Sequence, residues 1–107
     1  MKFFKVSLSL NKEGLNTYVS EWEVEEKKEI YKLLRTDSDG EKTVRHLKKD
    51  ELMKVNSYLL TTPSHIEYNM VCPEESLEEA KSILLERVKS TAFLFKKQIE
   101  ELNSHLT

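Results

Sequence analysis

Apolar and polar residues alternate over the first ten positions of the chain. The apolar set occupies every second position and is separated by lysine and serine: Phe4, Val6, Leu8 and Leu10. A period of two predicts a strand over 2–10 with one face on a core. Turn-forming residues at 11–14 then predict a hairpin to a second alternating run over 17–25, in which Tyr18, Ser20, Trp22 and Val24 share one side.

The middle of the chain predicts further strands, with one ambiguous segment. The β-favouring pair Ile30-Tyr31 indicates a strand over 28–35. The spacing Ser20-x-x-Glu23 and the many helix formers that follow leave a helix over 20–35 as the alternative. Shorter patterns predict strands at 43–47 and 65–72 and a short helix near 50–55, which completes an antiparallel sheet of four to five strands.

The final third of the chain has a different periodicity. Residues 74–106 contain neither glycine nor proline, and apolar residues recur every three or four positions: Leu77, Ala80, Leu84, Val88, Ala92, Phe95, Ile99, Leu102 and Leu106. This pattern predicts one amphipathic helix, about 45 Å long at 1.5 Å per residue. A break near Ser90 is the open alternative. The predicted fold class is α+β, in a single domain over 1–107 with a β-sheet core over 1–72.

The predicted helix is longer than the sheet that it could cover. A strand of eight or nine residues spans about 30 Å at most, and the apolar stripe continues beyond that length to Leu106. Exposed large apolar surfaces are rare on small monomers. We therefore expect a homo-oligomer, a dimer or higher, with an interface on the helix stripe: Leu84, Val88, Phe95, Ile99, Leu102 and Leu106. A helix that folds back at Ser90 would remove this need.

Composition and charge exclude several classes of protein. The 107 residues carry 17 basic and 19 acidic side chains, a net charge of −2, so no overall positive field favours nucleic acid. No apolar run approaches the ~20 residues of a membrane span. The single cysteine, Cys72, excludes an intramolecular disulfide framework and favours a reduced compartment. Early charges in Met-Lys-Phe-Phe-Lys also argue against a secretory signal, so we expect a cytoplasmic location.

Signals for catalysis or metal binding are weak. The three histidines lack metal-ligand spacing, and the turn at 36–40 fails as a calcium loop because Arg35 and His46 would occupy positions that need carboxylates. No serine lies in a nucleophile elbow, and Cys72 falls on an apolar strand face. We expect no cofactor, no metal and no enzymatic activity, with a small hydrolase as the alternative.

Basic residues are concentrated locally. Residues 27–54 carry nine basic and six acidic side chains. Four of the basic side chains, with one aromatic to stack on a base, are candidates for a site that binds a small anionic ligand such as a phosphorylated nucleotide: Arg35, Arg45, Lys48, Lys49 and Trp22. A solvated sheet edge whose lysines discourage aggregation is the competing interpretation.

Two stretches resemble a known group of proteins. The run from Trp22 to Leu33 (Trp-Glu-Val-Glu-Glu-Lys-Lys-Glu-Ile-Tyr-Lys-Leu) and the run from Val44 to Val55 (Val-Arg-His-Leu-Lys-Lys-Asp-Glu-Leu-Met-Lys-Val) resemble small accessory proteins of phages and mobile elements of Gram-positive bacteria. The resemblance implies a protein that inhibits a host defence protein or sequesters a defence signal, and it carries over no site residues. The leading hypothesis is a non-enzymatic, self-associating binding protein, with an oligomeric nucleotide sponge as the second.

Overall fold

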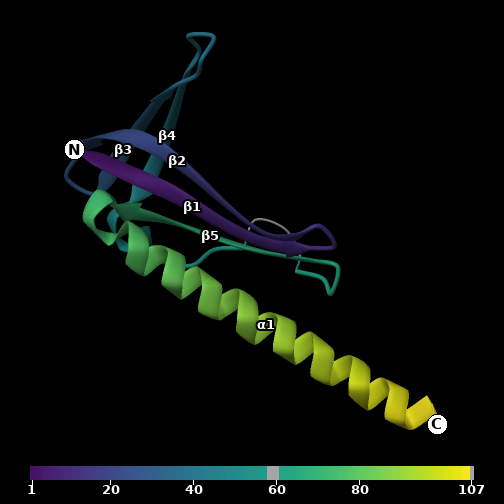
Figure 1. Cartoon of the computed structure of the whole chain (residues 1–107). Helices are drawn as coiled ribbons and strands as arrows, with labels where there is room; N and C mark the ends of the chain where they lie inside the picture. Colours follow the sequence, from purple (N-terminus) through teal and green to yellow (C-terminus); the bar gives the residue numbers. More distant parts are fainter. Residues whose placement is uncertain (58–60, 107) are drawn as a thin grey trace.

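The fold is a five-stranded sheet followed by one long helix (Figure 1). A computed structural model describes residues 1–57 and 61–106. The strands are β1 (Lys2–Asn11), β2 (Gly14–Glu26), β3 (Ile30–Thr36), β4 (Lys42–Lys48) and β5 (His65–Pro73). All neighbours are antiparallel, in the order β4-β3-β2-β1-β5. Two 3-10 turns, η1 (Lys49–Glu51) and η2 (Glu74–Ser76), precede β5 and the helix α1 (Leu77–Leu106). The predicted α+β class is confirmed.

The ambiguous segment forms strands, so the helical alternative over 20–35 is wrong. Its residues belong to β2 and β3, which pair with Glu23 opposite Leu34. A tight connection closes this hairpin, because the Lys27 N–H donates to the Ile30 carbonyl at 2.9 Å. Alternation of exposed glutamates with buried Trp22 suits one face of a strand, and this tertiary preference overrides local helix propensity.

The short helix predicted near 50–55 is the 3-10 turn η1, which is shorter than expected and begins at Lys49. After η1, residues 52–53 form a turn in which Met53 has a φ of 64°, and the chain then pairs with β5 through Asn56. The Met53 N–H donates to the Val71 carbonyl, and Asn56 and Asn69 exchange both backbone hydrogen bonds, each at 2.8 Å. Backbone pairing with an otherwise open sheet edge replaces the helical bonds, and Val55 packs against the core below.

The sheet has apolar cores on both faces. The first core lies between α1 and the alternating face of β1 and β5, where Val6, Met70 and Leu84 are fully buried. The second core lies on the opposite face and consists of Phe3, Trp22 and Leu33. Phe3 meets Tyr31 edge to face, with 4.9 Å between ring centroids. In its N-terminal half, the sheet therefore buries apolar side chains on both faces.

The helix α1 is continuous and projects from the sheet (Figure 1). The break considered near Ser90 does not occur. The Thr91 hydroxyl lies 2.9 Å from the Tyr68 hydroxyl and also donates to the Arg87 carbonyl at 2.9 Å, so the helix is tied to β5 at this point. Within the described residues, no helix combines the length and the hydropathy that a membrane crossing requires.

Candidate functional site

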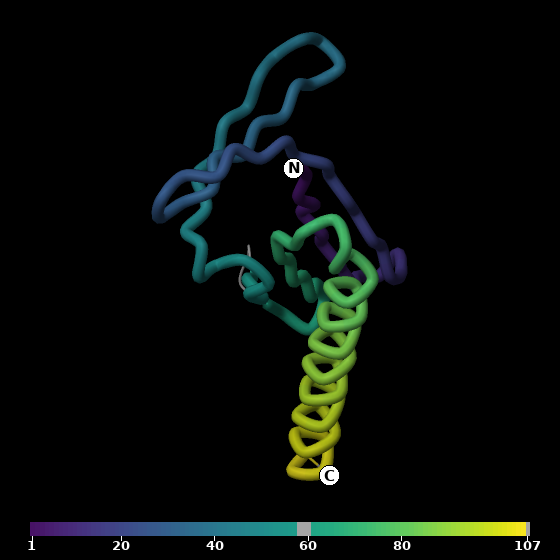
Figure 2. Tube along the Cα trace, turned by 90° about the vertical axis from the view of Figure 1, so that its left-hand side faces the viewer, coloured from purple at the N-terminus to yellow at the C-terminus, as the bar shows by residue number. Residues whose placement is uncertain are grey.

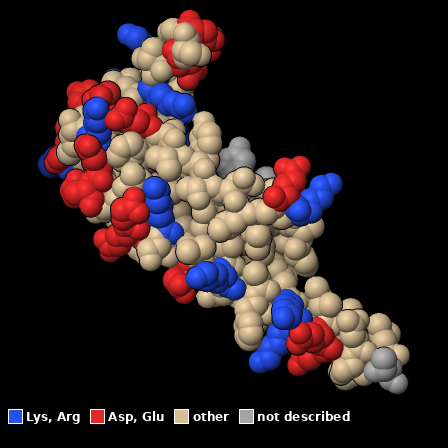
Figure 3. Space-filling model, viewed as in Figure 1, with Lys and Arg blue, Asp and Glu red and all other residues tan. Residues whose placement is uncertain are grey.

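The distal part of α1, which we define as residues 96–106, extends beyond the sheet. The last helical side chain packed against the first core is Phe95. Beyond it the same apolar stripe is exposed: Ile99 is 48%, Leu102 60% and Leu106 76% accessible. Figure 3 shows that the tip of the helix carries no lysine, arginine, aspartate or glutamate on the face in view. Leaving such side chains in water forgoes roughly 1.5–3 kcal/mol each compared with burial.

The whole molecule is more extended than a compact domain of its mass. Its radius of gyration is 17.0 Å and its extents are 58 × 31 × 22 Å, whereas a compact chain of this length has a radius of about 13 Å. Its accessible surface is 7720 Å², against about 6200 Å² expected for a compact monomer. The difference, about 1500 Å², exceeds the ~800 Å² that each partner contributes to a standard protein–protein interface.

A groove lies at the base of the distal segment, where the helix leaves the sheet. It has a volume of about 290 Å³ and is lined mainly by apolar side chains from β1, β5 and α1 together with Pro63. The apolar members are Leu10, Pro63, Ile66, Ala92, Phe95 and Ile99. The exposed stripe of α1 therefore continues directly into a concave apolar surface at the end of the sheet.

Two of the residues predicted for the interface are corrected by the structure. Leu84 and Val88 are buried against the chain's own sheet, so they are not available to another molecule. Phe95 marks the boundary, and Ile99, Leu102 and Leu106 remain accessible. The periodicity of the stripe does not show where the sheet beneath it ends. The sequence therefore could not separate the stripe residues that the sheet buries from those that stay exposed.

A polar cleft lies on the sheet face opposite α1. The sheet curls so that its two edge strands, β4 and β5, line the same cavity with segment 51–57 between them, and Figure 2 shows these segments arranged around an open ring. This cavity, of about 320 Å³, adjoins a second of about 480 Å³. Three residues line both: Lys5 from β1, Arg45 from β4 and Asn69 from β5.

The charge in the cleft is unevenly compensated. Three cations, Lys5, Arg45 and Lys54, line these cavities together with two carboxylates, Glu51 and Glu67. Burial and the nearby Arg45 guanidinium lower the pKa of Lys5, although Glu67 acts in the opposite direction. Within residues 1–57 and 61–106, neither Lys5 nor Arg45 forms an ion pair. The cleft therefore holds two cations that an anion between them would stabilise.

Most residues of the ligand site predicted from sequence lie elsewhere. Trp22 is buried in the second core, where its Nε1–H donates to Ser20 Oγ at 3.0 Å, so it cannot stack on a ligand base. Lys49 is held by Glu26 at 3.0 Å and lies over the Tyr31 ring.

The remaining basic residues of that predicted site divide between the two sheet faces. Arg45 pairs with Leu33 and Arg35 with Thr43 across β3 and β4, whereas Lys48 pairs with Ile30 on the other face. Of the five predicted residues only Arg45 lines the cleft. Lys5 and Asn69 were missed because the polar positions of β1 and β5 were assigned to solvent. Alternation alone does not reveal that the sheet curls over that face.

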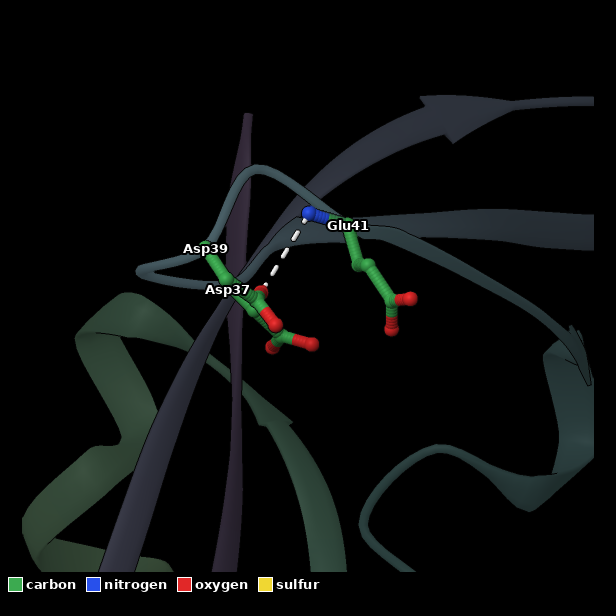
Figure 4. A group of neighbouring side chains, drawn as sticks. All are labelled: Asp37, Asp39 and Glu41. Carbon is green, nitrogen blue, oxygen red and sulfur yellow. Dashed lines mark hydrogen bonds between the residues drawn. The ribbon is translucent and has the colours of Figure 1, made fainter.

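Three carboxylates meet in the β3–β4 turn: Asp37, Asp39 and Glu41 (Figure 4). Their oxygens lie within 4.8 Å of one another, and all three residues are exposed. The Gly40 N–H donates to the Asp37 carbonyl at 3.0 Å and the Glu41 N–H to Asp39 Oδ1 at 3.4 Å. The turn itself accounts for this grouping, so it adds no argument for a bound cation.

Cys72 is fully buried in the first core. Burial raises the pKa of its thiol, although a backbone hydrogen bond at Phe4 acts in the opposite direction. A buried, protonated thiol is a poor nucleophile.

Comparisons with family models, with curated proteins and with solved structures found no match to this chain.

Proposed function

We propose that this chain is a non-enzymatic binding protein whose working form is a two-fold pair joined through the distal segments of α1. The observation that carries the proposal is the exposed stripe of Ile99, Leu102 and Leu106 beyond the end of the sheet. A second copy is the occupant that we assign to it. The stripe is self-complementary, and the excess surface of the monomer is larger than the area that each partner contributes to a standard interface.

The position of the sheet favours an antiparallel pair. The sheet covers the same face of α1 from Ala80 to Phe95 that the distal segment exposes. In a parallel pair the two sheets would therefore occupy the same space between the helices. An antiparallel two-fold axis places the sheets at opposite ends and leaves the distal segments free to meet.

The spacing of the apolar residues suits this arrangement. From Leu85 to Leu106 they follow a repeat of three and four, as in a two-helix seam: Leu85, Val88, Ala92, Phe95, Ile99, Leu102 and Leu106. The pairs Phe95–Leu106 and Ile99–Leu102 share a midpoint between residues 100 and 101. Around that midpoint Phe95 faces Leu106 of the second copy and Ile99 faces Leu102. Leu106 of each copy then reaches the apolar groove beside Phe95 of the other.

The remaining polar groups carry no specific signal for catalysis. The polar cleft gathers three cations, His46, two amides and the carboxylates of Glu51 and Glu67, and the chain's one thiol is buried. Inhibition of a host defence protein, which the resemblance of 22–55 implies, stays a prediction of that resemblance. Under this proposal the pair would offer two copies of any binding surface, related by the two-fold axis.

The test is the mass of the full chain in solution. Size-exclusion chromatography with light scattering should give twice the 12.6 kDa of one chain at micromolar concentration. Ile99→Glu should return the mass to one chain, because it places a charge in a seam that excludes water.

Phe93→Glu is the matched control. Phe93 is 67% exposed on the other side of the same helix, and its substitution introduces the same negative charge in place of an apolar side chain. It should leave the paired mass intact. A single-chain mass for the unmodified protein at 100 µM, or equal dissociation by both substitutions, would contradict the proposed pairing.

A further inference from the structure

We infer that the polar cleft opposite α1 binds a small organic phosphate, with the phosphate group held between Lys5 and Arg45. These two side chains and Asn69 come from three different strands and line both adjoining cavities. They therefore mark the point at which the two cavities meet. The site lies on the sheet face away from α1, so it is independent of the proposed pairing.

The donors at this point suit a phosphate. A guanidinium, an ammonium and a side-chain amide offer donors, and the two cations outnumber the one carboxylate beside them, that of Glu67. Arginine matches phosphate geometry with two parallel hydrogen bonds. Arg45 is exposed and Lys5 half-buried, so the first remains reachable while the second is partly removed from water. A bound dianion would offset the repulsion and burial that lower the pKa of Lys5.

The neighbouring floor of the cleft suits an organic group. Leu33, Leu47 and Val71 line the smaller cavity below the polar rim. Its volume of about 320 Å³ falls at the lower end of the range of ligand sites. Asn56, on the segment that closes the cleft, adds an amide at the edge. A flat apolar group attached to the phosphate could therefore lie on this floor while the phosphate stays between the cations.

The experiment titrates the ¹⁵N-labelled full chain with phenyl phosphate and follows amide chemical shifts. Saturable shifts are expected at 45–47 and 69–71, with weaker binding of inorganic phosphate and none of phenol. Arg45→Gln and Lys5→Gln should each weaken phenyl phosphate binding at least tenfold, since each removes a charge-assisted hydrogen bond to the phosphate. Arg45→Lys, which keeps the charge and loses the second hydrogen bond, should give an intermediate value.

Lys48→Gln is the matched control, because it removes a positive charge from the same strand outside the cleft. It should change the affinity by less than twofold. Equal weakening by Lys48→Gln would mean diffuse attraction, and absence of saturable shifts at 20 mM would mean no site; either result overturns the inference. Sedimentation with phosphatidic acid vesicles that Arg45→Gln abolishes would assign the phosphate to a lipid surface, which also contradicts a small ligand.

Discussion

The two ends of α1 carry the same apolar pattern in opposite surroundings. In the proximal part, Ala80, Leu84 and Val88 are buried between the helix and strands β1 and β5. In the distal part, Ile99, Leu102 and Leu106 continue the stripe and are exposed to solvent. The helix does not bend between them. What differs is only whether the sheet still lies beneath the stripe.

This contrast shows that the spacing of apolar residues identifies the apolar side of a helix. It does not show whether the same chain buries that side. The proximal stripe contributes to folding of the single chain, because its side chains leave water when the sheet forms. The distal stripe contributes little to the single chain, where only Ile99 reaches the groove at the end of the sheet, and it gains most of its burial when another surface meets it. The two parts should therefore respond differently to the same substitution.

Leu84→Ala should give the largest effect. Leu84 is fully buried beside Val6 and Met70, and removing a buried leucine side chain costs about 2–5 kcal/mol of unfolding free energy. Urea denaturation at low protein concentration measures it. Leu102→Ala under the same conditions should stay within about 0.5 kcal/mol, as expected for an exposed site. Similar losses for the two variants would erase the distinction between proximal and distal parts.

The sequence predicted the strands and the helix because each follows a simple period. The alternation in β1 and the three-to-four spacing in α1 depend only on local geometry. The second core escaped prediction, since Phe3 is out of phase with Phe4 and Val6 and belongs to the opposite face. Only the pairing of Phe3 with Trp22 across β1 and β2 shows that both faces carry apolar side chains.

The candidate sites were only partly predictable for the same reason. The overhang of α1 follows from comparing helix and strand lengths, but the position of its boundary at Phe95 depends on where the sheet lies. Arg45 and Lys48 look alike in a run of basic residues, although the register places them on different faces of β4. Lys5 and Arg45 are distant in sequence, and only the curl of the sheet brings them to one cleft.

The dependence of the melting temperature on protein concentration should distinguish the two parts of α1 by a second, smaller effect. If the distal segments pair, the melting temperature rises with concentration, because association stabilises the folded chain by mass action. Leu102→Ala should remove about 1–3 kcal/mol from the pairing and leave the melting temperature almost independent of concentration. Differential scanning calorimetry from 10 µM to 1 mM measures both. A concentration-independent midpoint for the unmodified chain would argue against pairing in this range.

Tyr68→Phe should give the smallest effect, and it tests the boundary between the two parts. The Tyr68 hydroxyl of β5 lies 2.9 Å from the Thr91 hydroxyl of α1, and the Tyr68 ring lies under Arg87. Removing only the hydroxyl leaves the ring packing and the cation–π contact, so the loss should be about 0.5–1.5 kcal/mol. Thr91→Val removes the other partner, and the double variant should cost less than the two single losses added, because both act on one bond.

Hydrogen exchange in Tyr68→Phe should show faster opening of the amides after Thr91 while those around Leu84 stay protected. If the amides around Leu84 opened equally fast, α1 would behave as one cooperative unit, and the boundary near Phe95 would describe burial without describing stability.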